Sequence, residues 1–158
     1  MDSVTKLLLE RSENEIDLAR VIFATTQDKK LQKEVFHLEK TQTFYSGVIA
    51  HAYYSIFYAA KAYLLSKGIK TYPPEEHKKA FLHFKKLTEQ GEIDKELLKL
   101  YTDAFVKAET LLGIFKVERQ KRGHFTYQRL AQANKEPAEE SLKNAEVFFK
   151  HIFNMCDK

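Results

Sequence analysis

The stretch from Phe44 to Lys67, FYSGVIAHAYYSIFYAAKAYLLSK, constrains the fold more than any other part of the chain. Between Val48 and Leu65 the plainly polar side chains are His51, Ser55 and Lys61. A helix that is apolar nearly all round belongs in the centre of a bundle or in a membrane. Lys61 and the interleaved tyrosines favour the bundle, because a spanning helix needs about 18 or more apolar residues with almost no charge. We therefore predict a central buried helix that ends at Gly68, and no membrane association.

The rest of the chain predicts one all-helical domain over residues 1–158. A chain of 158 residues is one domain by length, and its Gly 5 and Pro 3 allow few turns. The single Cys156 excludes an internal disulfide, so a reducing cytoplasm is the simplest location. The N-terminus MDSVTKLLLERSENE lacks the basic and apolar regions of a signal peptide.

Apolar residues at helical spacing predict four further helices, at about 3–26, 75–89, 93–117 and 137–155. Asp2 or Ser3 is the expected cap of the first helix. The pair Pro73–Pro74 precedes the helix at 75–89. Residues 27–43 are polar and weakly periodic, and their sequence does not decide between a short helix and a loop. The predicted architecture is an all-α bundle of four to five helices around a central buried helix.

The candidate functional segment is Lys116–Arg129, which follows the long helix at 93–117. Its cations outnumber its one acid, Glu118, by four, which equals the net charge of +4 of the whole chain. Arginine binds phosphate oxygens in a bidentate manner, and histidine exchanges its proton near neutral pH. From residue chemistry alone, an anion site and a basic helix end that merely complements the helix dipole are about equally favoured.

The geometry of the candidate site depends on how far the helix at 93–117 continues. If Arg119 and His124 were on one helix, the five-residue step would leave about 140° between them. For both to reach one phosphate, the helix must break near Gly123, or a second subunit must supply one set of groups.

The stretch AHAYYSIFYAAKAYLLSKGI, the order of the helices and the motif Arg-x4-His after the long fourth helix together resemble the HEPN superfamily, over about residues 44–153. Within it, the resemblance is to small stand-alone prokaryotic members. Arg119 matches the arginine of the family motif and His124 its histidine. Gln120 takes the position after the arginine, where the family often has a polar residue.

The resemblance implies a helical homodimer in which two Arg-x4-His motifs face each other across a cleft. It implies a metal-independent endoribonuclease without a cofactor, often a toxin that is paired with a minimal nucleotidyltransferase antitoxin. Arg119 and His124 would be catalytic, and the side chains that hold the RNA would be Lys116, Gln120, Lys121, Arg122, Tyr127 and Arg129. Other members are non-catalytic nucleotide-binding or adaptor subunits that work with such a nucleotidyltransferase, and this is the alternative function.

Two features of the chain depart from the family pattern. In some toxins a tyrosine two residues after the histidine is adenylylated by the antitoxin, whereas here that position is Thr126 and the tyrosine is Tyr127. Close relatives in this subgroup commonly have tyrosine in place of the histidine and are expected to be inactive, so His124 favours activity.

The remaining histidines and tyrosines have simpler interpretations. His51 in the central helix is interpreted as a buried, hydrogen-bonded core histidine, and His77 and His83 as surface or boundary residues. Several tyrosines of the central helix are expected in the core, and the rest at a dimer surface or under neighbouring helices.

Overall fold

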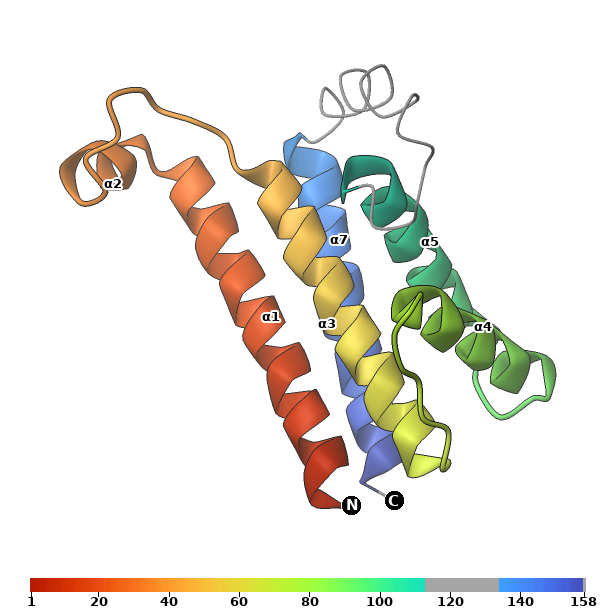
Figure 1. The fold of residues 1–158 in the computed structure, drawn as a ribbon. Coiled ribbons are helices and arrows are strands. Elements are labelled where there is room, and N and C mark those ends of the chain that lie inside the picture. Colours follow the sequence, from red (N-terminus) through yellow and green to blue (C-terminus); the bar gives the residue numbers. More distant parts are fainter. Residues whose placement is uncertain (113–133, 158) are drawn as a thin grey trace.

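A computed structural model describes residues 1–112 and 134–157 of the chain. Among these residues the elements are all helices: α1 (Ser3–Gln27), α2 (Lys29–Glu34), α3 (Tyr45–Ser66), α4 (Glu76–Glu89), α5 (Lys95–Leu112) and α7 (Lys135–Cys156). The all-α bundle predicted from the sequence is therefore confirmed. Figure 1 shows α1, α3 and α7 as long neighbouring helices, with α4 and α5 on the far side of α3 from α1.

The central position of α3 is confirmed as well. It packs against α1, α4, α5 and α7. The interleaved alanines explain how so many helices approach it, since Ala59, Ala60 and Ala62 are fully buried. From Val48 to Leu64 burial around α3 is complete except along one narrow stripe, where side chains such as His51 and Tyr58 are half-buried.

The core next to α3 is aromatic. Tyr101 of α5 lies with its ring centroid 5.3 Å from that of Phe84 of α4 and 5.9 Å from that of Phe148 of α7. All three residues are fully buried. These edge-to-face contacts join the three outer helices on one side of α3.

The ends of the helices follow from local sequence. Asp2 caps α1, because its carboxylate accepts hydrogen bonds from the backbone N–H groups of Val4 and Thr5. Gly68 has φ +77°, and the N–H of Ile69 donates to the carbonyl of Leu64 at 2.8 Å. This pairing closes α3 at the glycine, as the sequence predicts. The last helix begins at Lys135, before Pro137, which lies in its first turn where no N–H is needed.

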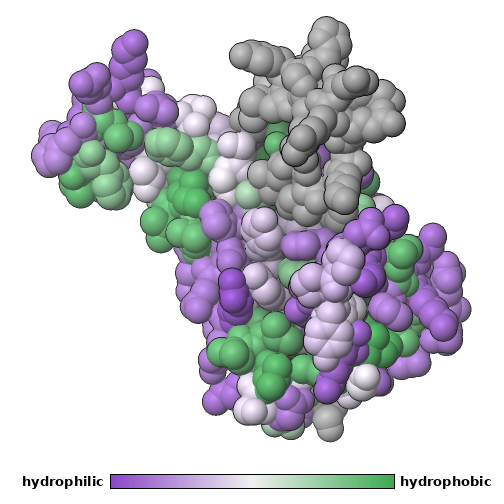
Figure 2. All heavy atoms as spheres, viewed as in Figure 1, coloured by the Kyte–Doolittle hydropathy of each residue, from purple (hydrophilic) through white to green (hydrophobic). Residues whose placement is uncertain are grey.

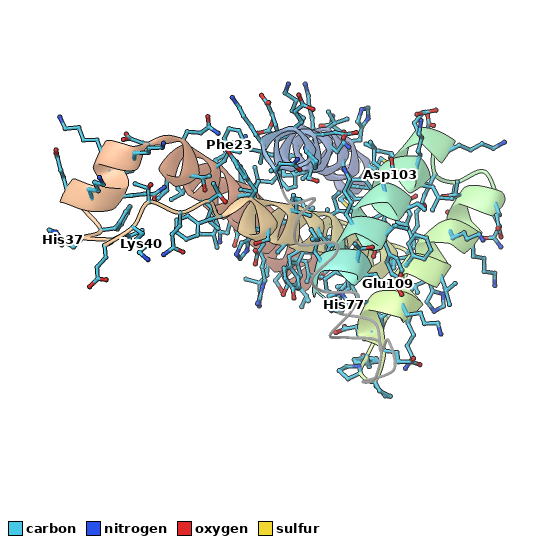
Figure 3. All side chains as sticks on the ribbon, turned by 90° about the horizontal axis from the view of Figure 1, so that it is seen from above. Phe23, His37, Lys40, His77, Asp103 and Glu109 are labelled. Atoms are coloured by element: carbon cyan, nitrogen blue, oxygen red, sulfur yellow. The ribbon has the colours of Figure 1, made fainter. Side chains whose placement is uncertain are left out.

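Residues 27–43 contain a short helix, α2, followed by an irregular stretch that leads to α3. Figures 1 and 3 show α2, with His37 and Lys40 after it, on the opposite side of the molecule from α4 and α5. The buried amide of Gln32 holds this segment. It donates to the carbonyls of Thr25 and Gln42 and accepts from the N–H of Gln42, at 2.7 to 2.9 Å.

Candidate functional site

The residues predicted for the catalytic and RNA-binding site lie outside the described residues. They are Lys116, Arg119, Gln120, Lys121, Arg122, His124, Tyr127 and Arg129. The structure places the two helix ends that flank them. Lys107 near the end of α5 lies 3.5 Å from the carboxylate of Glu140 near the start of α7. The end of α5 and the start of α7 are therefore neighbours in the bundle.

The described residues gather polar groups on one side of α3. His51 faces Glu15 of α1, and the distance from its Nδ1 to the carboxylate is 2.6 Å. Both side chains are partly accessible, at 29% for His51 and 18% for Glu15. The hydrogen bond predicted for His51 is confirmed, but the residue is half-buried at the surface rather than in the core. The reason is that α3 leaves a stripe of its surface uncovered between α1 and α4.

His77, in the first turn of α4, is the second histidine on this side. Its ring stacks on Phe57 with 3.9 Å between centroids, and its Nδ1 lies 2.8 Å from the hydroxyl of Tyr53. Burial lowers the pKa of His77 and raises the pKa of Tyr53 well above the usual range of a phenol. Both groups are therefore uncharged near neutral pH, which suits the hydrogen bond that they share.

Two cations complete the cluster. Lys61 lies 2.5 Å from Glu76 of α4, with both side chains about one-fifth exposed. Arg11 of α1 lies 4.6 Å above the ring of Tyr58. The cluster therefore brings acids of α1 and α4 against basic groups and aromatic rings of α3, and each charged group in it has a partner within the chain.

A recess of about 480 Å³ adjoins this cluster at the end of α3. Val4 and Leu8 of α1 and Leu65 and Ile69 at the end of α3 give it apolar walls, and Lys61 lies at its edge. A second recess of about 310 Å³ lies at the other end of the α1–α3 seam, where Ile22 meets Gly47.

The boundary position predicted for His77 agrees with its intermediate burial, but sequence reasoning did not predict its contacts with Phe57 and Tyr53. The available signal was its place two residues into a helix that follows Pro73–Pro74, since the start of that helix is brought back against α3. No periodicity within the helix itself distinguishes His77 from His83, which is exposed.

The described residues offer neither a metal site nor a membrane span. Within residues 1–112 and 134–157, histidines, cysteines and acids do not form a group of three or more that could hold a metal ion. Of the helices described there, none is long and apolar enough to cross a membrane.

The comparisons with known proteins identify the family. No curated protein matches the chain. The family model of the HEPN domain matches residues 28–154, which is most of the chain and includes α3, the basic segment and most of α7. This family is often linked to ribonuclease or nucleotide-binding roles. The match confirms the resemblance that the central helix and the Arg-x4-His motif indicate. The chain belongs to the HEPN domain family.

Proposed function

We propose that the protein is an RNA-binding, metal-independent endoribonuclease of HEPN type that acts as a homodimer in the cytoplasm. The observation that carries the proposal is the motif Arg119-x4-His124. It lies in the segment that holds the whole net charge of a chain belonging to this family.

The chemistry requires one proton-transfer group and cations at the phosphate. His124 takes the proton of a ribose 2′-hydroxyl, and the 2′-oxygen then bonds to the adjacent phosphorus. Arg119 stabilises the charge that develops on the phosphate oxygens. The bond from phosphorus to the 5′-oxygen breaks, and the leaving oxygen takes up a proton. The products are a 2′,3′-cyclic phosphate and a 5′-hydroxyl.

The side chains around the motif would hold the RNA. Lys116, Lys121, Arg122 and Arg129 bind the flanking phosphates, with an affinity that is sensitive to salt and largely independent of sequence. Gln120 and Tyr127 supply a hydrogen-bonding group and an aromatic ring for unpaired nucleotides.

The test is RNA cleavage in EDTA by the wild type, Arg119→Ala and His124→Ala, with the product ends analysed for 2′,3′-cyclic phosphate. We expect cleavage by the wild type and a loss of at least about 100-fold in each variant, the usual contribution of such a group. His83→Ala is the matched control, because His83 is exposed on α4 and has no proposed role. Intact RNA with the wild type, or equal cleavage by all four proteins, would refute the proposal and favour the adaptor alternative.

We propose further that the protein is the toxin of a toxin–antitoxin pair whose antitoxin is a minimal nucleotidyltransferase. Expression of the wild type should then arrest growth, and expression of His124→Ala should not. Normal growth with the wild type at the same protein level would leave the ribonuclease without a toxin role.

A further inference from the structure

The larger recess, of about 480 Å³, lies where α1 begins and α3 ends, and the segment that follows α3 completes its wall. Figure 1 shows this end of the bundle, where both termini lie, away from the end of α5 and the start of α7. The recess is therefore separate from the helix ends that flank the basic segment, and the proposed ribonuclease chemistry does not use it.

The walls of this recess are mainly aliphatic. The aliphatic side chains in it are Val4 and Leu8 of α1, with Leu65 and Ile69 from the end of α3. Val4 is 54% exposed and the other three are half-buried, so the chain leaves part of this apolar surface in water. Figure 2 shows hydrophobic side chains gathered at this end of the molecule. The volume of the recess lies within the range of roughly 300–1,000 Å³ that is usual for small-molecule sites.

Two charged groups of the recess are already matched within the chain. The ammonium group of Lys61 lies 2.5 Å from the carboxylate of Glu76. The carboxylate of Asp2 accepts hydrogen bonds from the N–H groups of Val4 and Thr5 and from the hydroxyl of Thr5, at 2.6 to 3.0 Å. A carboxylate has about four acceptor sites, so Asp2 has little capacity left for a ligand.

Two polar groups of the recess are not matched among the described residues. Lys70 lines the recess, is exposed, and has no carboxylate within ion-pair distance in that part of the chain. Thr71 also lines the recess and is only 8% exposed, yet its hydroxyl forms no hydrogen bond with another described group. Lys79 of α4 donates to the carbonyl of Tyr72 at 3.3 Å, and this contact holds the adjoining part of the wall in place.

The two unmatched groups, Lys70 and Thr71, select the chemistry of a ligand. An ammonium group only donates hydrogen bonds, and a hydroxyl can donate one. The polar end of the ligand must therefore accept hydrogen bonds, and one negative charge matches the unpaired ammonium group of Lys70. A carboxylate meets both requirements, and its charge-assisted hydrogen bonds are stronger than neutral ones. The rest of the ligand must be apolar to cover the aliphatic walls, where each buried CH₂ group raises the affinity by up to about fourfold.

A nucleotide suits the recess less well than an aliphatic carboxylic acid. A phosphate monoester carries a charge of about −1.5 to −2 near pH 7, whereas the described wall offers one unpaired ammonium group. Asp2 adds a negative charge to the same wall. The aromatic side chain of the wall, Tyr72, is 62% exposed and gives a base little enclosed ring surface. The recess therefore favours a single charge on an aliphatic chain.

We propose that the recess is a binding site for a small amphiphilic carboxylate, a carboxylic acid with an aliphatic chain. The chain of the ligand lies between the start of α1 and the end of α3, and its carboxylate binds the ammonium group of Lys70 and the hydroxyl of Thr71. This site goes beyond the proposed function, and it does not depend on the chemistry of Arg119 and His124.

Octanoate tests the chemistry of the site, with octylammonium and hexanoate as comparisons, in amide NMR titrations of the full chain. We expect octanoate to bind and octylammonium to bind at least about tenfold more weakly, because its head group cannot accept a hydrogen bond from Lys70. Hexanoate lacks two CH₂ groups and should bind more weakly than octanoate by up to about fifteenfold. Equal affinities for octanoate and octylammonium, or no binding of octanoate at millimolar concentration, would overturn the proposal.

A matched pair of lysine variants tests the role of Lys70. Lys70→Gln removes the charge of an exposed side chain, so the fold should persist and octanoate should bind at least about tenfold more weakly. The same variant should bind octanol, which has no charge, as the wild type does. Lys78→Gln is the control, because Lys78 is exposed on α4 and does not line the recess. It changes the net charge equally and should bind octanoate like the wild type.

The amide signals that shift also locate the ligand. Octanoate should shift residues 4–8 and 65–72, which surround the recess. Shifts confined to residues 116–129, or equal losses of affinity in Lys70→Gln and Lys78→Gln, would show that octanoate only follows positive charge, and would refute the site. The RNA assay is a separate result: octanoate bound in the recess supports this inference even if the wild type cuts no RNA, and an active ribonuclease without such binding refutes this inference alone.

Discussion

At the scale of single residues, removing the hydroxyl of either of two buried tyrosines should change the free energy of unfolding in opposite directions. The hydroxyl of Tyr101 has no hydrogen-bond partner among the described residues, whereas that of Tyr53 is bonded to His77. Burying an unpaired hydroxyl is costly, so Tyr101→Phe should leave the free energy of unfolding unchanged or raise it by up to about 1 kcal/mol. Tyr53→Phe should lower it by about 1 kcal/mol. Urea unfolding followed by circular dichroism measures both. A loss of more than about 1 kcal/mol in Tyr101→Phe would mean that its hydroxyl is satisfied after all.

His77 should make the fold weaker in mild acid. Its pKa in the folded protein is lowered by burial, so below the usual value of about 6.5 the unfolded chain takes up a proton before the folded chain does. The stabilising effect of the neutral imidazole is complete above that pH and is lost as the pH falls through the window below it. Urea unfolding at several pH values between 5 and 7.5 should therefore show a shallower loss of stability in His77→Gln than in the wild type. His83→Gln, which changes an exposed histidine on the same helix, should follow the wild-type curve, and an identical slope in all three proteins would contradict the assignment.

At the scale of elements, Gln32 should control the segment between α1 and α3. Gln32→Leu keeps the volume but removes the hydrogen bonds to Thr25 and Gln42, so buried backbone groups lose their partner. We expect residues 29–43 to exchange amide hydrogens faster in Gln32→Leu, while the melting of the whole protein changes little because α2 packs mainly against α1. Lys33→Leu, an exposed change on the same short helix, should exchange like the wild type. Equal protection of residues 29–43 in both variants would show that the side chain is not what holds the segment.

The sequence is sufficient to predict the helices, but not which of their faces remain uncovered in the fold. The difference has a physical reason. Helix ends depend on local chemistry, so the sequence alone predicts Asp2 as the cap of α1 and Gly68 as the end of α3. The central position of α3 follows from its apolar composition. Which stripe of α3 remains open depends on how α1 and α4 cross it, and these crossings join residues far apart in the chain, such as Glu15 with His51 and Tyr53 with His77. The sequence did not decide between a helix and a loop for α2, because the buried amide of Gln32 rather than a periodic apolar face holds this segment.

The candidate site shows the same division between local and long-range information. A short motif at a fixed spacing can be recognised without knowledge of the fold, so Arg119 and His124 could be proposed from sequence and their family confirmed. Their positions relative to each other lie outside the described residues and stay a prediction.

At the scale of the whole molecule, the net charge is concentrated in one segment of the sequence. Residues 116–129 carry a net charge of +4, and the remainder of the chain is balanced. If these cations bind RNA phosphates, the logarithm of the affinity should fall linearly with the logarithm of salt concentration, by about 0.7 for each phosphate contacted on a single strand. Lys121→Ala combined with Arg122→Ala removes two contacts and should flatten that slope by about 1.4. It should also weaken binding to unrelated RNAs by similar factors.

The matched control uses cations of the described bundle. Lys29 and Lys30 are an exposed adjacent pair on α2, far from the ends of α5 and α7 in Figure 1. Replacing both by alanine changes the net charge by the same amount. Fluorescence anisotropy from 50 to 300 mM salt would then separate local contacts from overall charge. If the salt dependence of the affinity falls equally in the two double variants, RNA affinity reflects the total charge of the protein. The basic segment then has no specific role in binding. If only Lys121→Ala with Arg122→Ala flattens the slope, the RNA lies along the segment that contains Arg119 and His124.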